Sequence, residues 1–175
     1  MDIQKPAGHL DQMIRQTRAH HVSLSSLADQ KANMMLTIAA LMIPLSTRFL
    51  YEERSHLAAT TLIAFCVLTI VLAAYAAMPK LKIRNGTVSS NDHKKASFNL
   101  LFFGSFTRMT YSEYMGAMET MMNDPNMVYE TQLREIYSMG HYLARKKYKF
   151  VLFSYLSFIT GILVSSTIYV IGSYS

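Results

Sequence analysis

Three long stretches without a charged residue constrain this chain most strongly. They cover about 16 residues between Lys31 and Arg48, about 23 between His56 and Lys80, and about 25 from Phe150 to the C-terminus. A membrane-spanning helix needs roughly 20 predominantly apolar residues, within a range of about 17 to 25. The second and third stretches meet this requirement, and the first is at its lower limit.

The composition agrees with a one-domain membrane protein. Only 16% of the 175 residues are charged, against about 25% in a typical soluble domain. The single cysteine, Cys66, lies in the second stretch and excludes both a disulfide framework and a cysteine-based zinc site. The polar N-terminus lacks the short apolar core of a signal peptide, so we expect insertion through the spans themselves.

The distribution of Lys and Arg predicts the topology, because these residues accumulate on the cytoplasmic side of membrane spans. Four lie in residues 1–31, two lie in the turn 46–56 beside Glu52 and Glu53, and the remaining eleven of the 17 lie in residues 79–150. This pattern favours three spans, with the N-terminus in the cytosol and the C-terminus outside.

The first stretch has an alternative interpretation as a buried helix of a soluble bundle. Pro44 favours that alternative, because proline removes a backbone hydrogen bond and kinks a helix. However, Pro44 lies near the outer end, and apolar residues surround the helix throughout 34–43. A helix that is apolar on all sides is deeply buried or in lipid, so we favour a span.

Helical periodicity continues from the first and third spans into the polar parts of the chain. Before the first span, one stripe recurs at spacings of three and four, formed by Leu10, Ile14, Thr17, His21, Leu24 and Ala28. Before the third, Asp124 and Pro125 start a helix whose stripe consists of Tyr129, Leu133, Ile136, Gly140, Leu143 and Lys147. These helices are too long for a bilayer alone, so their cytosolic halves should pack as a coiled-coil-like stalk.

The segment between the second and third spans is predicted to be a polar loop followed by short helices. Asn85-Gly86 predicts a turn, and Gly104 a bend within an aromatic cluster of Phe98, Phe102, Phe103 and Phe106. Thr110 and Glu113 have the spacing of a capping box. The helix after them should cover the stalk or lie on the membrane with one face, formed by Tyr111, Tyr114, Met115, Met118 and Met122.

These observations predict an all-α membrane protein with about three transmembrane helices and long helices that extend into a cytosolic helical stalk. The expected segments are a cytosolic helix at 1–31, spans at 32–50, 57–79 and 150–172, and a cytosolic helical region at 80–149. Ser157, Gly161 and Ser165 are spaced by four in the third span, a pattern that permits close helix packing in lipid. They predict packing within the chain or between copies, and we expect a homo-oligomer.

The sequence offers little for catalysis. It has no phosphate-binding glycine loop, no nucleophile motif and no convincing acid pair, so we expect no enzymatic activity. His20 and His21 are adjacent and therefore point to different faces of a helix, which argues against a metal site. The spans carry no ionisable residue beyond their ends, unlike proton-coupled transporters.

Three stretches of the chain carry a family resemblance. They are "LADQKANMMLTIAALM", "NLLFFGSFTRMTYSEYMGAM" and "YETQLREIYSMGHYLARKKYKFVLFSYLSFITGIL". In this order, over roughly residues 20–165, they resemble the Pycsar effector transmembrane family. The resemblance implies a bacterial anti-phage effector, activated by cyclic CMP or cyclic UMP from a cognate pyrimidine cyclase, that impairs the inner membrane and halts growth of the infected cell. No cofactor and no nucleic acid partner are expected.

A cyclic mononucleotide requires a cation for its phosphate and an aromatic face for its base. Cytosolic candidates for the phosphate are Arg108, Arg134 and Lys147, and candidates for the base or sugar are Phe103, Tyr111 and Tyr137. Packing or surface roles are the alternative for each residue. The basic run 145–149 also has two interpretations, as an anchor for anionic headgroups and as a phosphate ligand.

Asp29 and Lys31 form an acid and base pair at the mouth of the first span. Lys31 can extend toward lipid headgroups, whereas an acid gains nothing from an anionic surface. Asp29 is therefore predicted to bond within the protein, to Arg134 or to a basic residue of 145–149, and to act in assembly or switching. The alternative function for the whole chain is a non-enzymatic membrane scaffold that recruits a cyclase or a phosphohydrolase.

Overall fold

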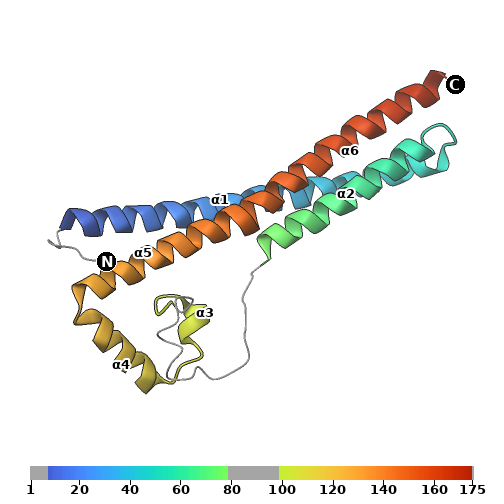
Figure 1. Cartoon of the computed structure of the whole chain (residues 1–175). Helices are drawn as coiled ribbons and strands as arrows, with labels where there is room; N and C mark the ends of the chain where they lie inside the picture. The colour runs from blue at the N-terminus through green and yellow to red at the C-terminus, as the bar shows by residue number, and fades with distance from the viewer. Residues whose placement is uncertain (1–7, 79–98, 175) are drawn as a thin grey trace. The chain divides into compact units, whose positions relative to one another are not determined.

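The computed structural model describes residues 8–78 and 99–174, and the described residues contain helices and no strand. In chain order, the helices are α1 (Gly8–Thr47), the 3₁₀-helix η1 (Arg48–Tyr51), α2 (His56–Ala77), α3 (Phe103–Phe106), α4 (Tyr111–Met122), α5 (Pro125–Tyr142), the π-helix η3 (Leu143–Tyr148) and α6 (Lys149–Tyr174) (Figure 1). The predicted all-α class is confirmed. Phe98 and the turn at Asn85-Gly86 lie outside the described residues.

Three helical segments are long and apolar enough to cross a membrane. They are Gly8–Tyr51, His56–Ala77 and the continuous helix Pro125–Tyr174, which is 50 residues long. The first apolar stretch was marginal by length, but it lies within a helix of 40 residues that passes through Pro44 to Thr47. The three-span membrane fold expected from the sequence is therefore confirmed.

Two helix starts have the predicted capping. The Thr110 hydroxyl accepts a hydrogen bond from the Glu113 N–H, and the Glu113 carboxylate accepts one from the Thr110 N–H at 2.8 Å, which completes a capping box for α4. At α5, the Asp124 carboxylate accepts a hydrogen bond from the Asn126 N–H at 3.0 Å, and Pro125 occupies the first turn. Both arrangements satisfy backbone N–H groups that lack a partner within the helix.

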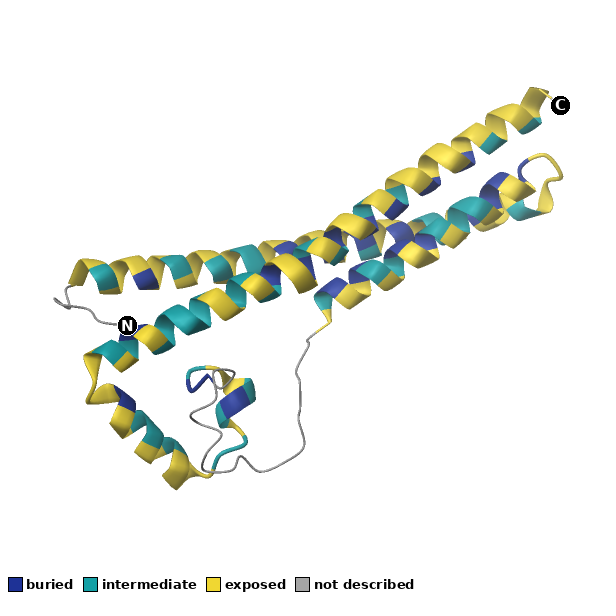
Figure 2. Ribbon diagram, in the orientation of Figure 1, coloured by how far each residue is buried: buried dark blue, intermediate teal, exposed yellow. Residues whose placement is uncertain are grey.

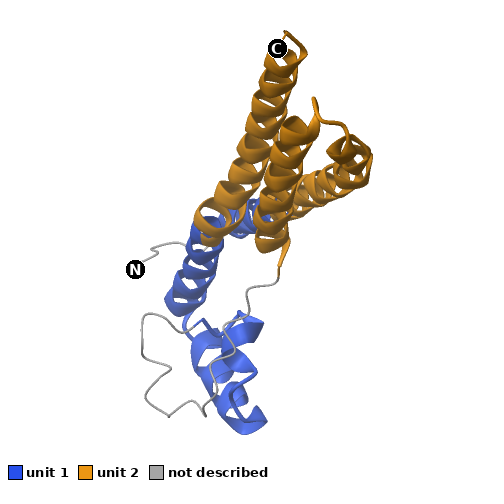
Figure 3. Cartoon of the chain, turned by 90° about the vertical axis from the view of Figure 1, so that its right-hand side faces the viewer, with its two compact units in different colours: residues 1–22, 79–141 blue, residues 23–78, 142–175 orange. Residues whose placement is uncertain are grey.

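The chain divides into two compact units, which we describe separately (Figure 3). We call residues 1–22 and 79–141 the stalk unit, and residues 23–78 and 142–175 the membrane unit. The helix α1 contributes residues to both units, and so does the continuous helix formed by α5, η3 and α6.

In the membrane unit, α2 packs along α6 with small side chains between them. From Cys66 onward in α2, and throughout α6, the buried residues recur at spacings of three and four. The buried residues are Ala58, Ala59, Cys66, Thr69, Ala73 and Ala76 of α2 and Val151, Ser154, Ser157, Gly161 and Ser165 of α6. Large apolar side chains point away from this contact, and Figure 2 shows exposed residues over much of both helices. Such an arrangement suits surrounding lipid.

In the stalk unit, the first turns of α1 pack against α5 along the predicted stripes. Ile14 is 7% exposed and Tyr129 6% exposed. The Tyr129 hydroxyl donates a hydrogen bond to the Asp11 carboxylate at 2.7 Å, and Arg18 forms an ion pair with Glu135 at 3.2 Å. These contacts confirm the predicted packing of the two long helices.

The face predicted for α4 is only partly covered within the described residues: Tyr114 and Met118 are half-buried and the other three residues are exposed. The alternative that this face lies on the membrane stays a prediction. Tyr111, Met115 and Met122 are 78%, 48% and 68% exposed, whereas Met121 is 4% exposed. Because α4 carries methionine or tyrosine on several sides, its sequence does not define a single apolar face. Gly104 lies in the one-turn helix α3 rather than at a bend, and a Cβ there would lie 2.5 Å from the Phe102 ring.

Candidate functional site

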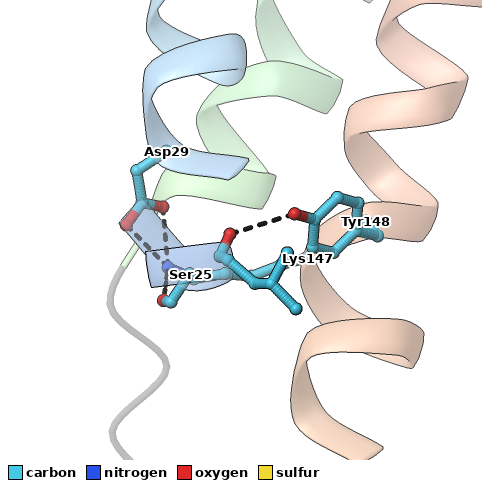
Figure 4. A network of polar contacts seen from close by, with 5 residues as sticks. Ser25, Asp29, Lys147 and Tyr148 are labelled. Atoms are coloured by element: carbon cyan, nitrogen blue, oxygen red, sulfur yellow. Dashed lines mark hydrogen bonds and ion pairs between the residues drawn. The ribbon is translucent and has the colours of Figure 1, made fainter. Parts of the chain in front are cut away.

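A polar cluster in the membrane unit joins α1 to the π-helix η3 (Figure 4). The Lys147 ammonium donates hydrogen bonds to both Asp29 carboxylate oxygens at 2.7 Å and to the Ser25 hydroxyl at 2.8 Å. Beside it, the Tyr148 hydroxyl donates to the Leu24 carbonyl at 3.1 Å. The partner of Asp29 is therefore a basic residue of 145–149, as one of the two alternatives predicted.

The Lys147 ammonium is held in an apolar environment. Its side chain is 9% exposed and that of Asp29 is 40% exposed. The adjoining core of the same unit consists of Ala28, Ala32, Ala76 and Val151. An ammonium buried there depends on its carboxylate partner, because an unpaired buried charge is strongly destabilising. The other three basic residues of 145–149 are exposed, as expected of an anchor for headgroups.

The π-helix η3 places Lys147 on the buried side of the long helix. Leu143, Lys147 and Val151 are all buried and are spaced by four. A turn of an α-helix takes about 3.6 residues, and the wider turn of the π-helix brings residues spaced by four closer to one line. Such π-turns occur frequently at functional sites. The sequence analysis missed this element, and the spacing of four followed by four does not identify it, because Ser157, Gly161 and Ser165 have the same spacing in the α-helix α6.

Lys31 and Tyr142 lie near the cluster, but no hydrogen bond described above includes either of them. Lys31 is exposed, consistent with extension toward headgroups. Burial raises the pKa of the Tyr142 hydroxyl, and the negative charge of Asp29 raises it further. Tyr142 therefore stays neutral at physiological pH, and the charges of the cluster are those of Asp29 and Lys147.

The three small residues of the third span all face α2. A Cβ at Gly161 would lie 2.4 Å from the Phe65 Cβ, so only glycine permits this approach. The Ser165 hydroxyl donates to the Ala58 carbonyl at 2.9 Å, and the Ser157 hydroxyl to the Phe65 carbonyl at 3.4 Å. Of the two predicted uses, the structure shows packing within the chain.

The six candidate nucleotide ligands are distributed over three places. Phe103, Arg108 and Tyr111 belong to one short segment of the stalk unit, in which both aromatic side chains are exposed. The Arg108 Nε is buried without a hydrogen-bond partner in the described part of the chain.

The other candidates lie on the long helix. Arg134 forms an ion pair with Glu130 at 2.7 Å. Tyr137 is 68% exposed, and its ring lies edge-on to the His141 ring at 4.5 Å between centroids. Lys147 belongs to the membrane unit and is bound to Asp29. Among the described residues, no hydrogen bond, ion pair or ring contact joins two of these six candidates.

A cleft in the stalk unit was not predicted. It has a volume of about 380 Å³ and is lined by residues of α1 and α5, namely Asp11, Ile14, Arg15, Arg18, Gln132, Glu135 and Ile136. From the sequence, Arg15 and Arg18 entered only as charges that set the topology. Arg15 and Arg18 follow Ile14 of the apolar stripe by one and four residues. This position beside the packed face of the helix was the sequence feature that indicated a place at the helix contact.

The match to known families agrees with this architecture. The family model described as the Pycsar effector protein domain matches residues 12–172. The chain belongs to this family. The match includes most of both long helices, the polar cluster and every residue that lines the cleft except Asp11. It gives this Pycsar effector a role in anti-phage defence at a membrane. No curated protein and no solved structure matches the effector.

The described residues of the effector show no metal centre. Across 8–78 and 99–174, no group of three or more His, Cys, Asp and Glu side chains could hold a metal ion. His20 and His21 lie on α1, and the His21 imidazole faces Gly140 in the stalk unit.

Proposed function

We propose that this effector is switched by a cyclic pyrimidine mononucleotide, cyclic CMP or cyclic UMP, supplied by a cognate cyclase during infection. The activated effector impairs the bacterial inner membrane, and the infected cell stops growing. Family membership supports this role. The observation that carries the switching step is that α1 and the helix Pro125–Tyr174 each contribute to both the stalk unit and the membrane unit.

The charge distribution supports a cytosolic N-terminus and stalk unit. Eleven of the 17 Lys and Arg residues lie in 79–150, and such residues accumulate on the cytoplasmic side. A nucleotide made in the cytosol then reaches the stalk unit directly. The loop between α1 and α2 and the C-terminus face the outside.

Switching requires two packings of the long helices and a ligand that prefers one of them. To reverse a population from 1:99 to 99:1, the ligand must prefer the second packing by about 10⁴-fold. The cluster of Asp29, Lys147 and Ser25 suits such a choice, since its hydrogen bonds are directional and lie beside an apolar core. The active packing exposes surface for a homo-oligomer that breaches the bilayer.

Dye release from liposomes tests this function. The purified full-length effector, inserted in liposomes that contain a quenched dye, should release it when cyclic CMP or cyclic UMP is added. Cyclic AMP and protein-free liposomes serve as controls. Equal leakage with every nucleotide and with none would contradict ligand gating. Intact membranes together with a stably co-purifying cyclase would instead favour a scaffold.

A further inference from the structure

We propose that the cleft in the stalk unit binds the activating ligand, and that Arg15 is its phosphate ligand. This inference rests on the proposed function, since it assigns the site at which the cyclic mononucleotide acts. The cleft lies between α1 and α5 and belongs to a single unit. Its position differs from that of all six ligand candidates named from the sequence.

Of the two arginines that line the cleft, one has no ion-pair partner among the described residues. The Asp11 carboxylate accepts the Tyr129 hydroxyl at 2.7 Å, and Glu135 neutralises Arg18 at 3.2 Å. Arg15 has no hydrogen bond or ion pair to the described residues and is exposed. A cyclic phosphodiester carries one negative charge, and a guanidinium presents two parallel N–H groups to such a group.

The volume of the cleft fits a single nucleotide. Small-molecule sites occupy about 300–1,000 Å³, and about 380 Å³ is near the lower limit of this range. A cyclic mononucleotide, with one sugar and one pyrimidine ring, suits this volume better than a cyclic dinucleotide.

The remaining lining residues can accept a flat base. Ile14 and Ile136 provide an apolar surface, and Ile14 is 7% exposed. The Gln132 amide offers both donors and an acceptor, which complements the alternating donors and acceptors on the edge of a pyrimidine. Because the amide can present either atom, it serves cytosine and uracil alike.

The site also connects to the proposed switch through the chain itself. Its two walls are α1 and α5, and α1 continues to Asp29 while α5 continues into η3 and Lys147. A ligand between the walls sets their separation in the stalk unit. Both partners of the buried ion pair lie on the continuations of these walls.

Binding to variants of the full-length effector in nanodiscs tests the site, with cyclic CMP and cyclic UMP titrated separately by calorimetry. Arg15→Gln should weaken binding by about tenfold or more, the effect of losing a charge-assisted hydrogen bond. The matched control is Arg134→Gln, which removes an arginine of α5 paired with Glu130 and should leave affinity within about twofold.

A second variant predicts a gain, which misfolding cannot produce. Glu135→Gln releases Arg18 as a second cation and should tighten binding several-fold. Wild-type affinity for both ligands in Arg15→Gln and Glu135→Gln would reject the cleft while leaving nucleotide activation intact, as would a loss confined to Arg134→Gln. Absence of binding by the wild-type effector to either nucleotide would reject the cleft and the proposed function together.

Discussion

The two units bring their long helices together by different means. In the membrane unit, α2 and α6 meet through Gly161 and through serine hydroxyls bonded to backbone carbonyls. In the stalk unit, α1 and α5 meet through an ion pair and a tyrosine bonded to a carboxylate. Lipid provides no hydrophobic drive between helices, so close backbone approach replaces it. Water allows charged side chains at the edges of the contact.

The Asp29–Lys147 contact does not follow this division. It is an ion pair, like the Arg18–Glu135 contact of the stalk unit, but it lies in the membrane unit. A buried ion pair is often no more stable than apolar residues of the same size. Stability alone therefore does not explain its presence, which is compatible with the switching role proposed above.

The largest expected effect comes from removing the acid of this pair. Asp29→Ala leaves the Lys147 ammonium unpaired and should destabilise the effector by about 2–3 kcal/mol, below the range of about 3–5 kcal/mol for a fully buried pair because Asp29 is 40% exposed. Thermal unfolding in detergent measures the loss. Lys31→Ala, which removes an exposed charge two residues away, is the control. Unchanged stability and full dye release would reduce the pair to a boundary marker.

A double variant separates stability from switching. Asp29→Leu combined with Lys147→Met replaces the pair by apolar residues and should regain most of the stability lost in Asp29→Ala. It should bind cyclic nucleotide but release no dye, because the directional hydrogen bonds that distinguish the two packings of the long helices are removed. Normal ligand-dependent release by the double variant would contradict a switching role.

A somewhat smaller effect is expected at the close contact of the membrane unit. Gly161→Ala places a methyl group against Phe65 and should destabilise the effector by about 1–2 kcal/mol, within the usual range for overpacking. Gly116→Ala is the matched control, because a Cβ there meets nothing within 4 Å and alanine favours the helix. Equal unfolding temperatures for the two variants would show that α2 and α6 do not meet at Gly161.

In the stalk unit, loss of one hydrogen bond should have a modest effect. Tyr129→Phe removes the hydroxyl that donates to Asp11 and should destabilise the unit by about 1 kcal/mol. Hydrogen exchange of the amides of α5 measures this locally. Tyr137→Phe, on an exposed side chain of the same helix, should change nothing.

The smallest effect concerns Tyr142, whose pKa is raised by burial and by Asp29. A raised pKa means that the neutral hydroxyl stabilises the fold below the unfolded value of 10.0, and this contribution is lost as the pH rises through the folded pKa. Asp29→Ala should lower the pKa of Tyr142. The pKa of Tyr142 is measured from the pH-dependent tyrosinate absorbance of a protein minus that of the same protein with Tyr142→Phe. An equal pKa with and without Asp29→Ala would exclude an influence of Asp29 on Tyr142.

Features that depend on local sequence could be predicted. The charge-free stretches, the stripe containing Ile14 and Tyr129, and the capping box at Thr110 depend on residues within a few turns of one another. The predicted partners of Asp29 were Arg134 and the basic residues of 145–149, because these cations lie on the helix that leads into the third span. Only the folded chain shows that the partner is Lys147.

The remaining features could not be read from local patterns. Which side of α4 is buried depends on the surrounding chain, since Met115, Met118, Met121 and Met122 are equally apolar and only Met121 is buried. The cleft joins Arg15 to Gln132, which are more than a hundred residues apart in sequence. The family resemblance did not locate it either, because a shared sequence does not state which side chains meet.

The wide turn at Leu143–Tyr148 also fixes the angular phase of the long helix. An α-helix turns by about 100° per residue, so the additional residue in this turn sets the side of the helix on which Lys147 lies relative to Leu143. Deletion of the exposed Ala144 would convert the turn to ordinary α-helix. It would rotate Lys147 about the helix axis by about that angle relative to Leu143.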